Sequence, residues 1–167
     1  MAIYLEGSID TLTNTGELTS ELGSSGTDPI PGGVIRMVND SSINTLNNSG
    51  TIETYDGTNV ISGGLINNLI NSGTIHADES DAVEGSIINI TNTGTISADG
   101  SRAINFNGDT LNNSGTISAG SSSALSINSD ATTVINSGTI SAVGDSGIRI
   151  SDMTRTKLIN VQIDVLK

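Results

Sequence analysis

The chain contains no cysteine, and this absence limits its chemistry. Disulfide bonds, zinc sites with thiolate ligands and a cysteine nucleophile are all excluded. Proline occurs only twice in 167 residues, and aromatic residues occur only as Tyr4, Tyr55 and Phe106. Any core that this chain forms must therefore be built from isoleucine, leucine, valine and alanine.

Basic residues are also scarce. Six Lys and Arg stand against 18 Asp and Glu, which gives a net charge of −12. Nucleic-acid binding requires a basic surface that neutralises phosphates, so we expect no nucleic-acid partner. No apolar run approaches the length of a membrane helix, and the start of the chain, Met1 to Glu6, lacks the basic and apolar regions of a signal peptide. We therefore expect no membrane insertion.

Six segments of the chain follow the pattern Leu-x-Asn-(Ser/Thr)-Gly-Thr-Ile. Their glycines are separated by 34, 23, 21, 21 and 23 residues, and such a period is typical of stacked repeats. The long first interval contains both prolines, so we interpret residues 22–33 as a loop insertion that leaves the coil. We expect residues 1–167 to form a single domain. The six turn glycines are Gly16, Gly50, Gly73, Gly94, Gly115 and Gly138.

The repeat from Ala103 to Ala119 predicts three short strands separated by bends, because apolar and polar residues alternate within it. The recurring Asn-Ser-Gly disfavours a helix, and the turn signals are too widely spaced for a sandwich of hairpins. We therefore predict an all-β fold: a single-stranded parallel β-helix, or β-solenoid, with about seven coils of 21–23 residues. A right-handed winding is expected because such crossovers dominate. The terminal coil, residues 147–167, is predicted to be degenerate because it lacks the Asn-Ser-Gly corner.

The asparagine of each repeat is expected to form a structural ladder along the solenoid. Stacked coils place equivalent residues about 4.8 Å apart, and an amide has both donors and an acceptor with which to bond to its copies or to the turn backbone. The glycine that follows is expected to relieve a bend, with a positive φ. The ladder asparagines are Asn14, Asn48, Asn71, Asn92, Asn113 and Asn136.

The sequence offers no catalytic constellation and no cofactor-binding motif. Its one histidine, His76, is expected on the solvated outer surface. The densest acidic cluster is weakly suggestive of calcium, the sole cofactor candidate, because carboxylate oxygens suit this ion. Its spacing matches no EF-hand, however, and a solvated turn is the preferred interpretation. The cluster contains Asp78, Glu79, Asp81 and Glu84.

The two ends of the chain differ in charge and lack a capping helix. Residues 1–21 carry acidic but no basic residues, whereas basic residues predominate in 149–167. Uncapped strand edges pair readily with another chain, so we expect a homopolymer formed by head-to-tail docking of the first strand on the last. Alternatively, the chain is a fragment whose flanking coils continue the solenoid. The residues expected to self-associate are Ala2, Ile3, Tyr4, Leu5, Leu158, Asn160, Gln162, Asp164 and Leu166.

The phrase Asn-Ser-Gly-Thr-Ile-Ser-Ala at 113–119 and 136–142 resembles the repeats of bacterial secreted β-helix proteins. Autotransporter passenger domains and large surface adhesins carry such repeats. The resemblance extends from Leu12 over most of the chain, through looser copies at 48–54, 71–77 and 92–98. It implies an extracellular or cell-surface location, but it does not specify a ligand, because fold and function separate readily.

Three functions are compatible with these observations. The first is a non-enzymatic extracellular structural protein that serves as a filament or matrix subunit. The second is an adhesin or autotransporter passenger fragment that binds a surface or glycan ligand through its outer face and the loop at 24–33. The third is a carbohydrate-acting β-helix, which is disfavoured because sugar-binding clefts usually offer aromatic platforms and paired carboxylates, of which this chain has few.

Overall fold

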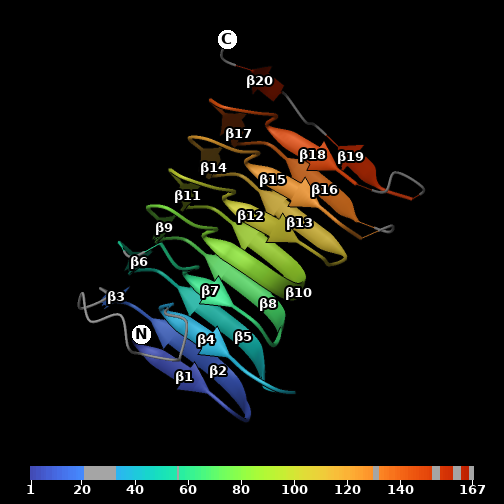
Figure 1. Cartoon of the computed structure of the whole chain (residues 1–167). Helices are drawn as coiled ribbons and strands as arrows, with labels where there is room; N and C mark the ends of the chain where they lie inside the picture. The colour runs from blue at the N-terminus through green and yellow to red at the C-terminus, as the bar shows by residue number, and fades with distance from the viewer. Residues whose placement is uncertain (21–32, 56, 130–131, 152–154, 160–162, 166–167) are drawn as a thin grey trace.

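The structure is a computed structural model that describes residues 1–20, 33–55, 57–129, 132–151, 155–159 and 163–165. These residues form twenty strands and no helix. Every strand pairing among them is parallel. The strands are stacked as rungs from the N-terminal coil to the C-terminal coil (Figure 1), and the predicted β-solenoid is therefore confirmed.

Each coil contributes to three parallel sheets, A, B and C, and β10 runs around a corner so that it belongs to both A and B. Sheet A contains β1 (Ile3–Leu5), β4 (Ile35–Met37), β7 (Ile61–Ser62), β10 (Val83–Asn92), β12 (Ile104–Phe106), β15 (Leu125–Ile127) and β18 (Ile148–Ile150). Sheet B contains β2 (Ser8–Asn14), β5 (Ser42–Asn48), β8 (Leu65–Asn71), β10, β13 (Thr110–Asn113), β16 (Thr133–Asn136) and β19 (Lys157–Ile159). Sheet C contains β3 (Glu17–Ser20), β6 (Thr51–Thr54), β9 (Thr74–Ala77), β11 (Thr95–Ala98), β14 (Thr116–Ala119), β17 (Thr139–Ala142) and β20 (Ile163–Val165).

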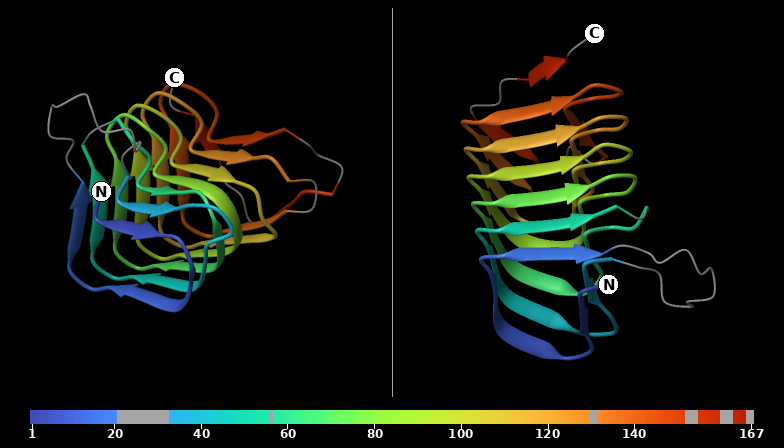
Figure 2. Two further views of the ribbon diagram at one scale, coloured as in Figure 1. Left: turned by 60° about the horizontal axis from the view of Figure 1, so that its bottom comes forward. Right: turned by 90° about the vertical axis from the view of Figure 1, so that its left-hand side faces the viewer.

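The chain winds in the expected right-handed sense. In the left view of Figure 2 the N-terminal coil is nearest the viewer, and the chain passes through β1, β2 and β3 clockwise as it recedes. The right view shows the strands of sheet C as a regular stack. Right-handed crossovers predominate because right-twisted strands favour them.

The core consists of side chains that alternate inward along each strand. In sheet C the pattern is plain, because Ile75, Ile96 and Ile117 are 0% exposed and lie in register on consecutive rungs. The last residue of each of these strands is small and buried, so the interior narrows there. Full burial of one such isoleucine contributes about 1.5–3 kcal/mol. The sheet C column of small residues is Ser20, Thr54, Ala77, Ala98, Ala119 and Ala142.

The coils from β4 to β17 have a neighbour on both sides, and only they are fully enclosed. Their core side chains, from Val34 to Ala142, are almost completely buried. In the first and last coils the equivalent Leu12, Leu18 and Ile148 are only partly buried. The regular body is thus about five turns long, slightly fewer than the seven coils predicted, because that prediction counted the terminal coils with the enclosed ones.

The three corners of the coil differ in how much their length varies. Between sheets B and C, two residues separate the strands in every coil from β2–β3 to β16–β17. In the same coils, the number of residues between sheets A and B ranges from none within β10 to five between β15 and β16. The predicted insertion at 22–33 falls between sheets C and A, and all of it except Gly33 lies outside the described residues. In the predicted terminal coil, β18, β19 and β20 each pair with the preceding coil.

Candidate functional sites

The six asparagines form one continuous ladder at the corner between sheets B and C. Each is at least 94% buried. The Nδ2 group of each of the first five donates to Oδ1 of the asparagine on the next coil, over 2.7–2.8 Å. For example, Asn92 Nδ2 bonds to Asn113 Oδ1 at 2.8 Å, to the carbonyl of Gly94 at 3.2 Å and to that of Thr116 at 3.1 Å. The amides therefore satisfy each other and the corner backbone without a ligand.

All five links of this ladder point in the same direction. Every amide donates toward the C-terminal end and accepts from the N-terminal side. Among the described residues no side chain donates to Oδ1 of Asn14, the first member. The ladder thus has an acceptor at its N-terminal end, whereas its last described member, Asn136, donates to the carbonyl of Gly138 at 3.0 Å.

Glycine is required at the same corner because a side chain there would clash with the neighbouring coil. The expectation of a positive φ at these glycines is wrong. None of the six has a positive φ. From Gly50 onward, a Cβ atom would instead lie nearer than 3.0 Å to the carbonyl oxygen of the corner glycine one coil below. The exception is Gly16 in the first coil, where a Cβ would have no neighbour within 4 Å. Coil-on-coil stacking, and not backbone conformation, therefore selects glycine here.

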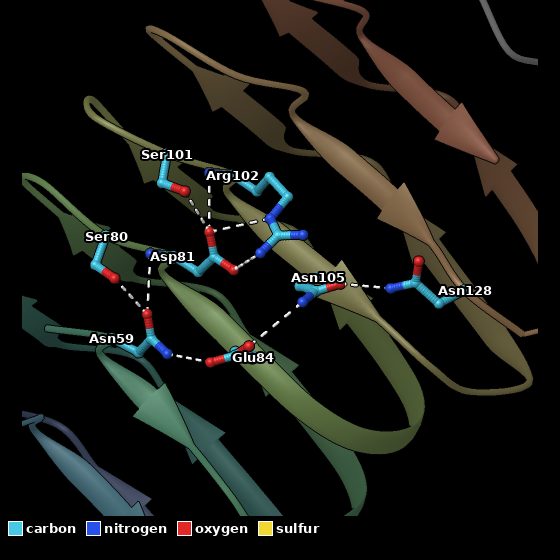
Figure 3. A network of polar contacts seen from close by, with 8 residues as sticks. All are labelled: Asn59, Ser80, Asp81, Glu84, Ser101, Arg102, Asn105 and Asn128. Atoms are coloured by element: carbon cyan, nitrogen blue, oxygen red, sulfur yellow. Dashed lines mark hydrogen bonds and ion pairs between the residues drawn. The ribbon is translucent and has the colours of Figure 1, made fainter. Parts of the chain in front are cut away.

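A second polar cluster lies at the corner between sheets C and A. Asp81 is 3% exposed, and its Oδ2 atom forms an ion pair with Arg102 Nη2 at 2.8 Å. Its Oδ1 atom accepts bonds from the Ser101 hydroxyl and from the backbone N–H and Nε of Arg102. Figure 3 shows this group, in which the Asp81 carboxylate links its own coil to Ser101 and Arg102 on the next coil.

A row of amides and one carboxylate continues from this cluster over sheet A (Figure 3). Asn59 Oδ1 accepts bonds from the Ser80 hydroxyl and the Asp81 N–H, while its Nδ2 donates to Glu84. Glu84 also accepts a bond from Asn105 Nδ2 at 3.5 Å, and Asn105 Oδ1 accepts one from Asn128 at 2.6 Å. These bonds orient the Glu84 carboxylate on the outer surface.

The structure does not assemble the four acidic residues proposed for calcium into a metal site. Within the described part of the chain, no group of three or more His, Asp or Glu side chains could hold a metal ion. Asp81 is turned to Arg102 and Glu84 to two asparagines, while Asp78 and Glu79 lie at the exposed corner before them. The sequence places these carboxylates close together, but the coil directs them to different partners.

Two further titratable groups, His76 and Asp145, have defined hydrogen-bond partners. His76 is on the outer face of β9, where Nδ1 lies 2.9 Å from the Ser97 hydroxyl on the next rung. The pKa of Asp145 lies below its ordinary value because the hydroxyl of Ser123 and the backbone of Ser146 donate hydrogen bonds to its carboxylate. The first contact brings a hydroxyl within reach of an imidazole, but among the described residues no side chain bonds to Nε2 of His76 to orient the ring, as a catalytic triad requires.

Open strand edges occur at both ends of the described solenoid. Ala2 and Ile3 donate backbone hydrogen bonds to Val34 on the second coil, and Tyr4 is 42% exposed. Leu158, on the last coil, is also 42% exposed. Of the other residues expected to self-associate, Leu5 is partly buried in β1 and Asp164 lies in β20. Asn160, Gln162 and Leu166 are outside the described residues.

Comparison of the chain with known families, curated proteins and solved structures finds no match. Within the described residues there is no helix with the length and apolar character needed to cross a membrane. The chemistry of this chain must therefore be judged from its own geometry.

Sequence reasoning missed the Asp81–Arg102 pair and the row from Asn59 to Asn128. The signal was present in the spacing, because Asp81 and Arg102 are 21 residues apart, which is the repeat period itself. Glu84 and Asn105 are also separated by 21 residues, and Asn105 and Asn128 by 23. A search for complementary polar residues at the repeat period would have found both sets.

Proposed function

We propose that this chain is a non-enzymatic extracellular structural protein whose solenoids stack head to tail into a filament or matrix. The observation that carries the proposal is the first coil, which has the side-chain pattern of the enclosed coils but a neighbour on one side only. Among the described residues, β1, β2 and β3 pair only with β4, β5 and β6. Their outer edges present backbone donors and acceptors, which are a template for another strand.

The side chains at this edge are those that a further coil would cover. Ile9, Leu12 and Leu18 continue the core columns but remain partly exposed. The space next to Gly16 is open, whereas every later corner glycine has the preceding glycine's carbonyl against it. An added coil would remove the exposed apolar area from water, a gain of about 25 cal/mol per Å².

The direction of the asparagine ladder favours head-to-tail contact over contact between like ends. Stacking two N-terminal ends would place two Asn14 acceptors together, with no donor between them. Stacking unlike ends instead keeps the same donor-to-acceptor direction in both chains, with Asn14 of one chain facing the end toward which the ladder of the other chain donates. A contact of this type does not close on itself unless rotation permits, so it extends into a fibre.

The charges of the two ends also favour this arrangement. In the first coil Glu6, Asp10 and Glu17 are exposed, and residues 1–20 contain no basic side chain. In the last coil Arg149, Arg155 and Lys157 are exposed. Opposite charge at the two ends attracts unlike ends over about 10 Å at 0.1 M salt, while the overall charge of −12 keeps other surfaces apart.

The extracellular assignment is supported by the resemblance of the Asn-Ser-Gly-Thr-Ile repeats to those of bacterial secreted β-helix proteins. An adhesin passenger that binds a surface ligand is the second candidate function. It is favoured by a polar hollow on sheet A, which is lined by Arg36, Ser62 and Glu84.

Electron microscopy and sedimentation of the purified chain test the assembly. We expect filaments from the unmodified chain and monomers from Gly16→Leu, because a Cβ atom at Gly16 meets no atom within 4 Å and the leucine would occupy the open stacking surface. The matched control is Ser72→Leu, which places the same side chain at an exposed corner of an enclosed coil and should still form filaments. A wild-type chain that stays monomeric at high concentration, or a Gly16→Leu variant that assembles normally, contradicts the proposal.

A further inference from the structure

The outer face of sheet A contains an open hollow of about 410 Å³ over β4, β7 and β10. Arg36 pairs in register with Ser62, and Glu84 follows on the next rung because Val83 pairs with Ile61. The small Ser62 and Gly63 thus lie between two long side chains. Two strand spacings separate Arg36 from Glu84, roughly 10 Å along the solenoid.

The acidic wall of this hollow is held in place before any ligand arrives. Glu84 accepts hydrogen bonds from Asn59 and Asn105, on the coils before and after it. Asn59 is itself fixed by Ser80 and by the Asp81 N–H. A carboxylate has about four acceptor positions, so two remain for a ligand, and the pre-set geometry lowers the entropy lost on binding.

The lining determines the class of ligand that fits. Glu84 provides acceptors, the Arg36 guanidinium provides donors, and the Ser62 hydroxyl between them can act as either. Apolar ligands are disfavoured because the lining is largely polar, and nucleic acid is disfavoured by the net charge of −12. A molecule with hydroxyl groups on both sides of a ring satisfies all three groups.

We propose that this hollow binds a saccharide of one or two sugar units. Neighbouring hydroxyls of the sugar donate to Glu84, its other oxygens accept from Arg36, and its ring lies over Ser62 and Gly63. The volume falls within the roughly 300–1,000 Å³ of small-molecule sites. The site is on the side of the solenoid, so saccharide binding does not depend on end-to-end assembly. A filament of stacked chains would present one such site per chain.

The test is titration of the full chain with a panel of neutral, amino and acidic mono- and disaccharides, followed by calorimetry and NMR. We expect at least one sugar to bind at millimolar concentration or below. Ser62→Leu should weaken that binding by about tenfold or more because it fills the hollow. Ser118→Leu is the matched control, since Ser118 has the same outward, half-buried setting on sheet C, and it should bind as the unmodified chain does.

Glu84→Gln provides a second variant, and it should weaken binding by several fold because a carboxylate accepts stronger hydrogen bonds than an amide. Circular dichroism and thermal melting of each variant separate lost binding from lost folding. The proposal is overturned if no sugar in the panel binds at millimolar concentration, or if Ser62→Leu binds as tightly as Ser118→Leu. Repeating the titrations with Gly16→Leu, which is expected to stay monomeric, keeps the outcome for saccharide binding separate from the outcome for filament formation.

Discussion

At the scale of single residues, the B–C corner shows how stacking restricts side-chain choice. A glycine there has no positive φ, but the carbonyl of the preceding coil lies where its Cβ atom would be. The neighbouring asparagine has the opposite role, because its amide fills the corner with three donated hydrogen bonds. One position excludes a side chain and the other requires a particular one.

Alanine at two corner glycines should therefore have opposite effects. Gly94→Ala forces its Cβ against the Gly73 carbonyl, and we expect a loss of about 1–3 kcal/mol in the free energy of unfolding. Gly16→Ala meets no atom within 4 Å, so it should be neutral or stabilising by about 0.5 kcal/mol, because alanine restricts the unfolded chain. Urea unfolding of both variants measures the difference, and equal losses would show that conformation, not contact, selects glycine.

Asn92→Asp should disrupt the ladder while preserving its shape. The new carboxylate would face the oxygens of Asn113, Gly94 and Thr116, to which Asn92 now donates. We expect a loss of about 3 kcal/mol or more at neutral pH. The exposed Asn112→Asp is the control, and it should change stability little.

The Asn92→Asp penalty should depend on pH. Burial and facing oxygens raise the pKa of the new carboxyl above its unfolded value, so the folded state binds the proton more tightly. The folded state therefore regains stability as pH falls through that raised pKa, and it is penalised fully above it. Melting temperatures of Asn92→Asp, Asn112→Asp and the unmodified chain between pH 4 and pH 8 give the comparison; a pH-independent difference would contradict this account.

At the scale of strands and corners, features that recur in every coil could be predicted from the sequence, whereas a contact that occurs in one coil could not. The inward columns and the asparagine ladder could be predicted because each recurs in every coil. The Asp81–Arg102 pair occurs once, so no repetition exposed it, and the local run of acids pointed to calcium instead. Local spacing misleads at a corner because the partner of Asp81 is one full coil away in the chain.

Asp81→Asn tests the contribution of this corner pair. The substitution retains an oxygen for Ser101 but turns a donor toward the Arg102 guanidinium, which leaves a charge beside a nearly buried group. We expect a loss of about 2 kcal/mol, within the range for a broken charged hydrogen bond. Asp99→Asn makes the same change at an exposed position of the next turn and should have little effect. Equal melting temperatures for the two variants would show that the pair is not important for stability.

At the scale of the whole molecule, the solenoid is a one-dimensional stack in which each coil contacts only its neighbours. Stability should then scale with the number of coils, and a whole coil should be removable. Deletion of residues 116–138 joins Gly115 to Thr139 and keeps two residues at the B–C corner. It also keeps both Asp81 and Arg102.

The shortened chain should fold, with a urea m value lower by roughly one seventh because less surface is exposed on unfolding. Deletion of 117–138 is the control. It leaves one residue too many at a corner whose length is constant, and each added residue reverses the inward and outward faces of a strand. We expect that control to be much less stable; equal stability of the two deletions would argue against a fixed corner.

The contrast between the constant B–C corner and the variable A–B corner has a practical consequence for engineering. Foreign peptides grafted between β12 and β13, or between β15 and β16, would leave the asparagine ladder and the glycine contacts in place. The same peptides at the B–C corner would separate the coils. The fold is thus a display scaffold with a permissive A–B edge and a B–C edge that must remain closed.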